Sequence, residues 1–330
     1  MKETMTQYLA IMLSALLLAG CTSGAKSPAG ASSARGDLKS VPAFSADSAY
    51  AYIARQLEFG ARVPGSVAQD SCAAWLRHTL ERHGASVHEQ RTTVTAYDGT
   101  LLPCINLVGS YNPDATHRVL LMSHWDSRPV ADEDPNPALR SQPVPAANDG
   151  ASGVGVLLEI ARQASLQLPQ TGIDILLSDV EDYGPSDSWT GEHREEWWGL
   201  GTQAWCRQPH VEGYTATYGI LLDMVGAADA TFYREYYSER YAGDVVRMVW
   251  KTAARLGYGR LFVDADGGGI TDDHTFVNRM AGIPTIDIID TRPHQSGSFF
   301  PYWHTTGDDL SQISRETLQK VGDVLMQLLW

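Results

Sequence analysis

The chain has 330 residues, of which 43% are hydrophobic and 19% are charged. This composition is typical of a globular protein, and the length is sufficient for one large domain with a sizeable core. The formal net charge of −14 gives no support to a nucleic acid or an anionic membrane surface as a partner.

The first 21 residues have the features of a targeting segment. Lys2 supplies a positive charge, and the apolar run of residues 8–18 is too short for a membrane span but suits the core of a signal peptide. The run ends in Leu18-Ala19-Gly20-Cys21, which resembles the cleavage box of bacterial lipoproteins. The resemblance implies that Cys21 becomes the lipidated first residue of the mature protein. An ordinary signal peptide with an incidental cysteine is the alternative.

Residues 22–44 are mostly small and polar and show no periodicity, so we expect a flexible tether. The expected protein is therefore exported and anchored by lipid to a bacterial membrane, on the periplasmic face of the outer membrane. Residues 45–330 are expected to form one catalytic domain, because no internal repeat and no second domain boundary is visible.

Three cysteines remain after the anchor, at Cys72, Cys104 and Cys206. An odd number leaves at least one thiol unpaired in an exported protein. We expect all three to be buried apolar residues, with one disulfide as the alternative.

Two helices and a strand are predicted at the start of the domain. The first helix begins at residues 45–47 and carries Ala49, Ile53 and Leu57 on one face. The second places Leu76 and Leu80 at helical spacing and ends near residue 84. Apolar and polar side chains alternate over residues 86–95 sufficiently to predict a strand.

Short apolar runs alternate with helical patterns through the rest of the chain. Strands are predicted at residues 119–122, 173–177, 220–222 and 283–289, and helices at residues 155–166, 244–256 and 314–329. This alternation favours a single α/β domain with a mostly parallel, buried central sheet flanked by helices.

Polar groups follow three of the predicted strands directly. His124 and Asp126 follow the first, Glu181 and Asp182 follow the second, and Asp223 follows the third. Sites in open α/β sheets form beyond the carboxyl ends of the strands, so these side chains are expected on one rim.

Two further residues could complete a metal site. Asp149 precedes a predicted helix in a glycine-rich turn, where it could be an N-cap or a metal ligand. His304 lies in a polar loop after the last strand and could be a surface residue or a ligand. A mixture of imidazole nitrogen and carboxylate oxygen suits zinc, whereas ligation by oxygen alone would favour magnesium or calcium.

Adjacent carboxylates at Glu181 and Asp182 indicate two roles. One can bind the metal while the other stays free as a general acid/base, with its pKa raised toward neutrality by desolvation. A solvated acidic turn is the alternative interpretation.

Together these residues resemble the M28 metallo-aminopeptidase family, which uses co-catalytic zinc ions. The resemblance covers about residues 45–330 and implies a single α/β domain that acts on peptide N-termini. Several motifs are closer to one branch, the zinc glutaminyl cyclases of the animal type and their bacterial relatives. These motifs are residues 59–66 (FGARVPGS), 124–128 (HWDSR), 222–227 (LDMVGA), 271–274 (TDDH) and 303–304 (WH).

The branch implies one zinc per chain, held by Asp149, Asp182 and His304. It implies Glu181 as the general acid/base, and Asp223 and Asp272 as catalytic carboxylates near the substrate. The substrate pocket would be lined by Trp198, Trp303 and His274. His124 and Asp126 would hold a second metal or support the first.

The chain departs from the animal enzymes in three respects. Those enzymes carry Glu at the position of Asp182, and they have a disulfide near the position of His124, where this chain has no flanking cysteines. A long loop, residues 184–198, follows the catalytic pair. One of Trp189, Trp197 and Trp198 would take the place of the tryptophan that lines the substrate pocket of the animal enzymes. Trp198 is favoured because the sequence pattern shared with those enzymes resumes directly after it.

The implied reaction is cyclisation of an N-terminal glutamine to pyroglutamate with release of ammonia, so the expected partners are peptides or proteins with N-terminal glutamine. A zinc aminopeptidase that hydrolyses N-terminal residues is the first alternative, because its two metals would use the same ligands. An inactive binding module on the same fold is the second.

Overall fold

The computed structural model describes residues 38–330 except residue 187 and residues 293–298. The predicted signal peptide, Cys21 and most of the tether lie outside the described residues. Within the described part, no helix has the length and apolar character needed to cross a membrane.

The end of the predicted tether packs on the domain. The Phe44 side chain is 5% exposed, and Lys39 exchanges two backbone hydrogen bonds with the side chain of Gln327. Lys39 and Phe44, which were expected to belong to a flexible tether, are therefore held against the domain.

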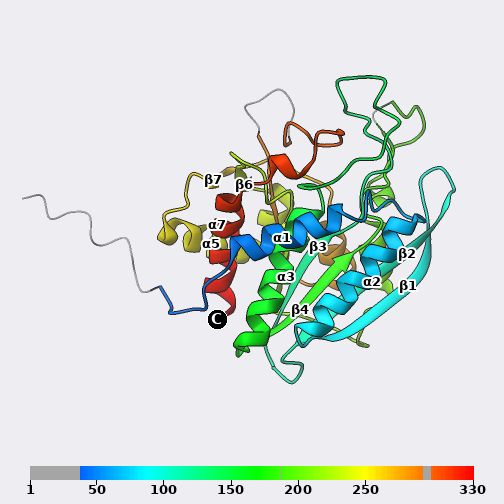
Figure 1. Cartoon of the computed structure of the whole chain (residues 1–330). Coiled ribbons are helices and arrows are strands. Elements are labelled where there is room, and N and C mark those ends of the chain that lie inside the picture. The colour runs from blue at the N-terminus through cyan, green and yellow to red at the C-terminus, as the bar shows by residue number, and fades with distance from the viewer. Residues whose placement is uncertain (1–37, 187, 293–298) are drawn as a thin grey trace, which may run out of the picture. The chain divides into compact units, whose positions relative to one another are not determined.

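A six-stranded sheet lies at the centre of the described residues (Figure 1). In spatial order its strands are β1 (Ser86–Thr95), β2 (Leu101–Tyr111), β4 (Gly172–Ser178), β3 (Arg118–His124), β5 (Tyr218–Asp223) and β8 (Thr285–Ile289). The pairs β4–β3, β3–β5 and β5–β8 are parallel, while β1–β2 and β2–β4 are antiparallel. The prediction of a mostly parallel central sheet is confirmed.

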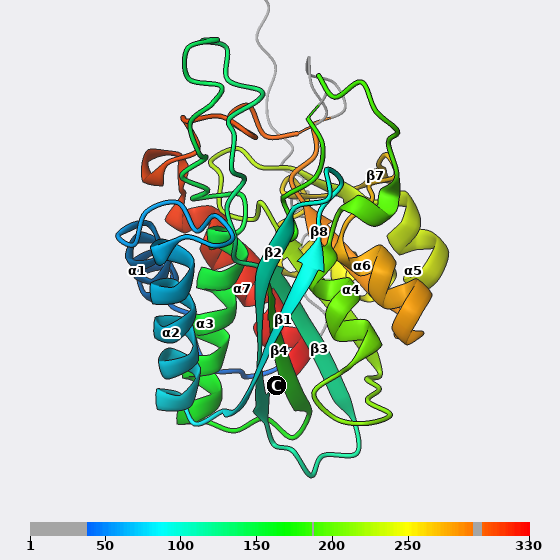
Figure 2. The same ribbon diagram turned by 90° about the vertical axis from the view of Figure 1, so that its right-hand side faces the viewer.

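Helices cover both faces of the sheet (Figure 2). One face is covered by α1 (Ala46–Leu57), α2 (Val67–Arg82), α3 (Ala151–Leu166) and α7 (Arg315–Leu329), and the other by α4 (Leu200–Arg207), α6 (Asp273–Phe276) and a π-helix (Val277–Ala281). Helix α5 (Tyr236–Leu256) packs against β8 and α7. Short elements complete the chain: β6 (Phe232–Arg234), β7 (Phe262–Asp266) and 3-10 turns at Glu195–Trp197 and Leu310–Gln312.

The central strands are apolar on both sides because both faces are covered. Leu121 and Leu177 point into the core beneath α1, α3 and α7, while Leu120 and Leu176 point into the core beneath α4. Serine side chains cap the helices at the start of the domain and at its end, where Ser45, Ser66 and Ser314 accept backbone N–H groups.

Several elements differ from the sequence prediction, and three of them are long enough to matter for the fold. Strand β2 was not expected, since Pro103 within it cannot donate a ladder hydrogen bond. Helix α5 begins at Tyr236 rather than residue 244, and a non-helical residue, Ala242, interrupts its periodicity. Helix α4 was also not expected.

The three described cysteines are free thiols. Cys72 and Cys104 are buried as expected, whereas Cys206 is only half-buried.

Candidate metal centre and catalytic site

The polar residues that follow the central strands meet at one rim of the sheet. His124 is the last residue of β3 and Asp223 the last of β5, which lies next to β3. Glu181 and Asp182 follow β4 on the other side of β3. Adjacent parallel strands thus deliver all four side chains to the same region, as the strand-end argument predicts.

The first cluster contains Asp149, Asp182 and His304. One potential ligand atom from each lies within 4.8 Å of the others, and all three residues are buried. His304 Nε2 is 3.1 Å from Asp182 Oδ1 and 3.8 Å from Asp149 Oδ2. These are the three residues that the sequence proposes as ligands.

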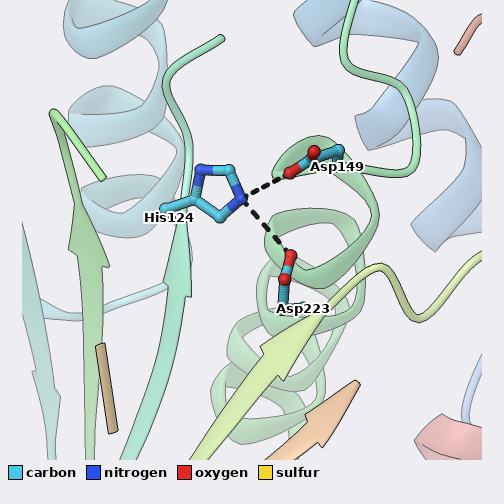
Figure 3. A group of neighbouring side chains, drawn as sticks. All are labelled: His124, Asp149 and Asp223. Carbon is cyan, nitrogen blue, oxygen red and sulfur yellow. Dashed lines mark ion pairs between the residues drawn. The ribbon is translucent and has the colours of Figure 1, made fainter. Parts of the chain in front are cut away.

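A second cluster shares Asp149 with the first. His124 Nε2 is 3.0 Å from Asp149 Oδ1 and 3.3 Å from Asp223 Oδ1. Figure 3 shows both carboxylates turned toward the same nitrogen of the imidazole. The two oxygens of Asp149 therefore face different clusters. A carboxylate placed in this way can bridge two metal ions or orient one.

The nitrogen and oxygen atoms of the two clusters are suited to coordinate a cation. His124 Nε2 and Asp223 Oδ1 are buried and make no hydrogen bond within the described residues. Burial, followed by the charge of Asp182, raises the pKa of Asp149 to about 6. A bound cation would relieve this repulsion, and the imidazole and carboxylate donors are those that zinc accepts.

Asp126 supports the rim and does not face the clusters. Its carboxylate accepts the backbone N–H groups of Glu181 at 3.1 Å and Asp182 at 3.2 Å. It also lies 3.3 Å from His124 Nδ1, the nitrogen that points away from Asp149. Asp126 thus orients His124 and the catalytic turn, as carboxylates commonly do behind metal-binding histidines.

Two acidic residues that the sequence analysis did not assign also hold residues of the site in place. Asp132 lies 3.5 Å from His304 Nδ1 and accepts two hydrogen bonds from Arg128, each at 2.6 Å. Asp308 accepts the backbone N–H groups of Asn148 at 2.8 Å and Asp149 at 3.0 Å. Asp308 lies four residues after His304 in the same polar loop, and this position was the available sequence signal.

Left-handed backbone conformations gather at this rim. Val180, Met224 and His304 have φ values of 52°, 49° and 53°. Such values are costly for these residue types, above all for the β-branched Val180, and they occur mainly where the surroundings enforce them. Each lies at or beside a candidate site residue, so the fold holds the turns of the site in fixed, strained shapes.

A cavity of about 290 Å³ opens onto the first cluster. Its lining includes Arg128, Glu181, Trp198, Asp272, Phe299 and Trp303. The structure therefore places both Trp198 and Trp303 in the wall. Trp189 and Trp197 instead pack against Tyr97, with ring centroids 4.9 Å and 6.1 Å apart.

Glu181 faces the cavity but belongs to neither metal cluster. Burial, followed by the charge of Asp272, raises its pKa well above the usual value. Asp182 lies in the first cluster instead. The two adjacent carboxylates therefore occupy different environments, as a division into one ligand and one proton carrier requires.

His274 lies behind the cavity wall rather than in it. Its side chain is fully buried, and Nε2 is 3.1 Å from Glu235 Oε2. This position differs from the predicted contact with substrate, because Asp272 faces the cavity while His274, one position into α6, points toward α5. Asp287 on β8 was also overlooked, although a carboxylate within an apolar strand is a clear sequence signal.

The structure is thus an α/β domain with a cluster of carboxylates and imidazoles at its strand ends, an arrangement that suits a bound metal ion. The model of peptidase family M28 matches residues 106–329, and the chain belongs to this family.

Solved structures of similar sequence cover nearly the whole domain. The glutaminyl cyclase of Porphyromonas gingivalis is 50% identical, with a TM-score of 0.83 over 87% of this chain and 98% of that one. The glutaminyl cyclase of Bacteroides thetaiotaomicron, bound to N-acetylhistamine, is 48% identical, with a TM-score of 0.86 over 88% and 99%. A Zn-dependent exopeptidase of Parabacteroides distasonis is 49% identical, with a TM-score of 0.86 over 88% and 99%.

Curated relatives match less of the chain. The bovine glutaminyl-peptide cyclotransferase is 25% identical in an alignment that covers 67% of this chain and 64% of the relative. An aminopeptidase of Bacillus subtilis is 26% identical over 67% of this chain and 43% of its own length. The chain thus spans less than two thirds of these curated relatives.

Proposed function

We propose that the protein is a glutaminyl-peptide cyclotransferase, which converts the N-terminal glutamine of peptides to pyroglutamate and releases ammonia. The observation that carries this proposal is a small cavity walled by Trp198 and Trp303, in which Glu181 stands free beside the metal cluster. The glutaminyl cyclases of two bacteria, at 48% and 50% identity, support the same assignment.

Asp149, Asp182 and His304 would hold one zinc ion. When bound, the metal supplies a Lewis acid that polarises the side-chain amide of the substrate. Glu181 accepts a proton from the α-amine as the amine nitrogen bonds to the amide carbon. It then returns the proton to the departing nitrogen as the old C–N bond breaks and ammonia leaves. The raised pKa of Glu181 suits both transfers.

Asp223 and Asp272 complete the catalytic set. Both line the cavity beside Glu181, where they can orient the amine and the leaving amide nitrogen. The indoles of Trp198 and Trp303 form an apolar wall that keeps bulk water from the reacting carbon, and this favours cyclisation over hydrolysis.

A zinc aminopeptidase is the second candidate, and one observation favours it. The cluster of His124, Asp149 and Asp223 offers a second metal position that shares a carboxylate with the first. A co-catalytic pair of this kind would activate water instead of excluding it.

One experiment separates the candidates. The zinc-loaded protein is incubated with a peptide that begins with glutamine and, as a control, with one that begins with leucine, and ammonia and free amino acids are measured separately. We expect ammonia from the first peptide, no free amino acid from either, and one zinc per chain by elemental analysis. Release of free amino acid with two metals bound would establish the aminopeptidase, and the absence of both products would establish an inactive module.

We also propose that the protein is exported and anchored through lipid on Cys21, facing the periplasm from the outer membrane. The expected test result is that Cys21→Ser releases the protein from membranes without changing its turnover. A variant that still sediments with membranes would contradict the proposal.

A further inference from the structure

One buried carboxylate joins three elements behind the cavity. Glu235 caps α5 and is 2% exposed. Its Oε1 accepts the N–H groups of Tyr237 at 2.8 Å and Ile270 at 3.0 Å, and its Oε2 accepts that of Ser238 at 2.6 Å. His274 Nε2 lies 3.1 Å from the same Oε2. Although burial acts to raise it, the hydrogen bond from His274 holds the pKa of Glu235 below its usual value.

Glu235 thus has four hydrogen-bond partners. Three are backbone N–H groups, which can only donate, and the fourth, His274 Nε2, donates to an ionised carboxylate in the tautomer that carries its hydrogen there. These partners occupy both carboxylate oxygens, so a substituted side chain would disturb the arrangement. An amide would present its NH₂ group to two donors, and a shorter carboxylate would not reach all four.

The segment that Glu235 holds forms part of the cavity wall. Residues 269–272 all line the cavity, and the bonded N–H of Ile270 is two residues before Asp272. His274, the other bonded group, is two residues after Asp272. The catalytic carboxylate is therefore held on both sides by a single buried anchor.

Asp287 extends the connection to the sheet. It is fully buried on β8, its Oδ2 is 3.8 Å from His274 Nδ1, and its backbone N–H donates to Ser238 Oγ at 2.9 Å. Atoms of Asp272, His274 and Asp287 lie within 4.8 Å of one another. Glu235, His274 and Asp287 consequently form a continuous polar group behind Asp272, none of which lines the cavity.

We propose that Glu235 is a positioning residue for the cyclisation. Through Ile270 and His274 it fixes the segment that presents Asp272 to the substrate. This inference rests on the proposed function for its kinetic readout, but the anchoring of residues 269–272 can be measured without any substrate.

Two substitutions separate positioning from helix capping. Glu235→Gln replaces one acceptor oxygen by an NH₂ group, which then faces hydrogen-bond donors instead of accepting from them. Glu235→Asp keeps a favoured N-cap for α5 but is one methylene shorter, so the reach to Ile270 and His274 is lost. Glu159→Gln is the matched control: Glu159 is also fully buried and accepts hydrogen bonds from Ser45, Arg162 and Gln163, but it lies on α3 outside the cavity lining.

The full-length, zinc-loaded variants are compared by steady-state kinetics, zinc content and hydrogen–deuterium exchange. Misplacement of a catalytic group by about 1 Å can cost on the order of 10²-fold in rate, so we expect kcat to fall about 10- to 100-fold in both Glu235 variants. KM and zinc content should change little, and exchange in residues 267–272 should become faster. Glu159→Gln should leave kcat and exchange in that segment unchanged.

Defined results would overturn the proposal. A folded Glu235→Asp protein with unchanged kcat and unchanged exchange in residues 267–272 would do so, even if Glu235→Gln does not fold. A metal ion beyond those of the two rim clusters, lost in Asp287→Asn, would show that the buried group is a cation site instead. If the unmodified protein releases no ammonia, the proposed function fails, while the exchange measurement still tests the anchor.

Discussion

Buried charge occurs at both ends of the central strands, but the charged groups at the two ends differ in how completely they are hydrogen-bonded within the described residues. Near the start of β4, Asp174 is fully buried and accepts four hydrogen bonds. Arg118 donates two at 2.7 Å each, Ser110 donates one at 2.6 Å and Tyr214 donates one at 2.9 Å. This group is complete within the protein and has no capacity for a ligand.

At the opposite end of the central strands, several buried polar atoms have no hydrogen-bond partner. His124 Nε2, Asp223 Oδ1 and Asp272 Oδ2 are buried without a hydrogen-bond partner in the described part of the chain. Unsatisfied buried polar atoms cost free energy and are rare in folded proteins unless they have a function. Between these two groups of charged residues, the missing hydrogen-bond partners, rather than buried charge itself, mark the candidate site.

The largest effect on turnover is expected when the candidate site loses one of its metal ligands. Asp182→Ala removes one of three donors from the first cluster, so we expect loss of the metal and no measurable turnover. Metal analysis and the ammonia assay check both outcomes. The control is Asp182→Glu, the residue that the animal enzymes carry, which should retain metal. An active, metal-loaded Asp182→Ala protein would contradict the assignment of the first cluster.

A smaller effect is expected at the neighbouring carboxylate. Glu181→Gln removes the proton carrier but no ligand, and general acid–base groups typically contribute about 10²–10⁴-fold, so kcat should fall by that factor. KM should change less, and the metal should remain bound. Kinetics and metal analysis on the same preparation provide the measurement. A Glu181→Gln protein without metal would show that the two carboxylates have the opposite roles.

The smallest effect on turnover is expected at the complete end. Asp174→Asn replaces an acceptor of four hydrogen bonds and leaves the Arg118 charge without its partner, so we expect a loss of about 2 kcal/mol in the free energy of unfolding. Metal content and kcat of the folded protein should not change. Thermal unfolding measures the first outcome and the ammonia assay the second. If Asp174→Asn lowered kcat strongly without lowering Tm, Asp174 would have a catalytic rather than a structural role, and the comparison of the two ends would fail.

The sequence predicts the parallel part of the sheet well, for a physical reason. Strands β3, β4, β5 and β8 are buried on both faces, so they are visible as short apolar runs. Strand β2 is not visible in this way because it pairs antiparallel with the edge strand β1 and contains Pro103. The start of α5 is hidden by the break at Ala242.

Within the site, the sequence predicts which residues end the strands but not which way each side chain points. Asp149, Asp182 and His304 meet as expected because strand order and turn positions suffice to bring them together. Asp272 and His274 are two residues apart at the start of a short helix, so they point in different directions. Glu235 gives no clear sequence signal, since the two partners that connect it to the cavity wall, Ile270 and His274, are 35 and 39 residues further along the chain.

The ligands of the first cluster come from widely separated parts of the chain. Asp149 precedes α3, Asp182 follows β4, and His304 follows β8, close to the last helix. No partly synthesised chain that stops before residue 304 contains all three residues, so the complete cluster cannot form until synthesis is nearly finished. A metal ion that needs all three residues would therefore bind late, when most of the chain is already available for folding. With the proposed function, we expect protein made without metal to be inactive and to gain activity when the ion is added later.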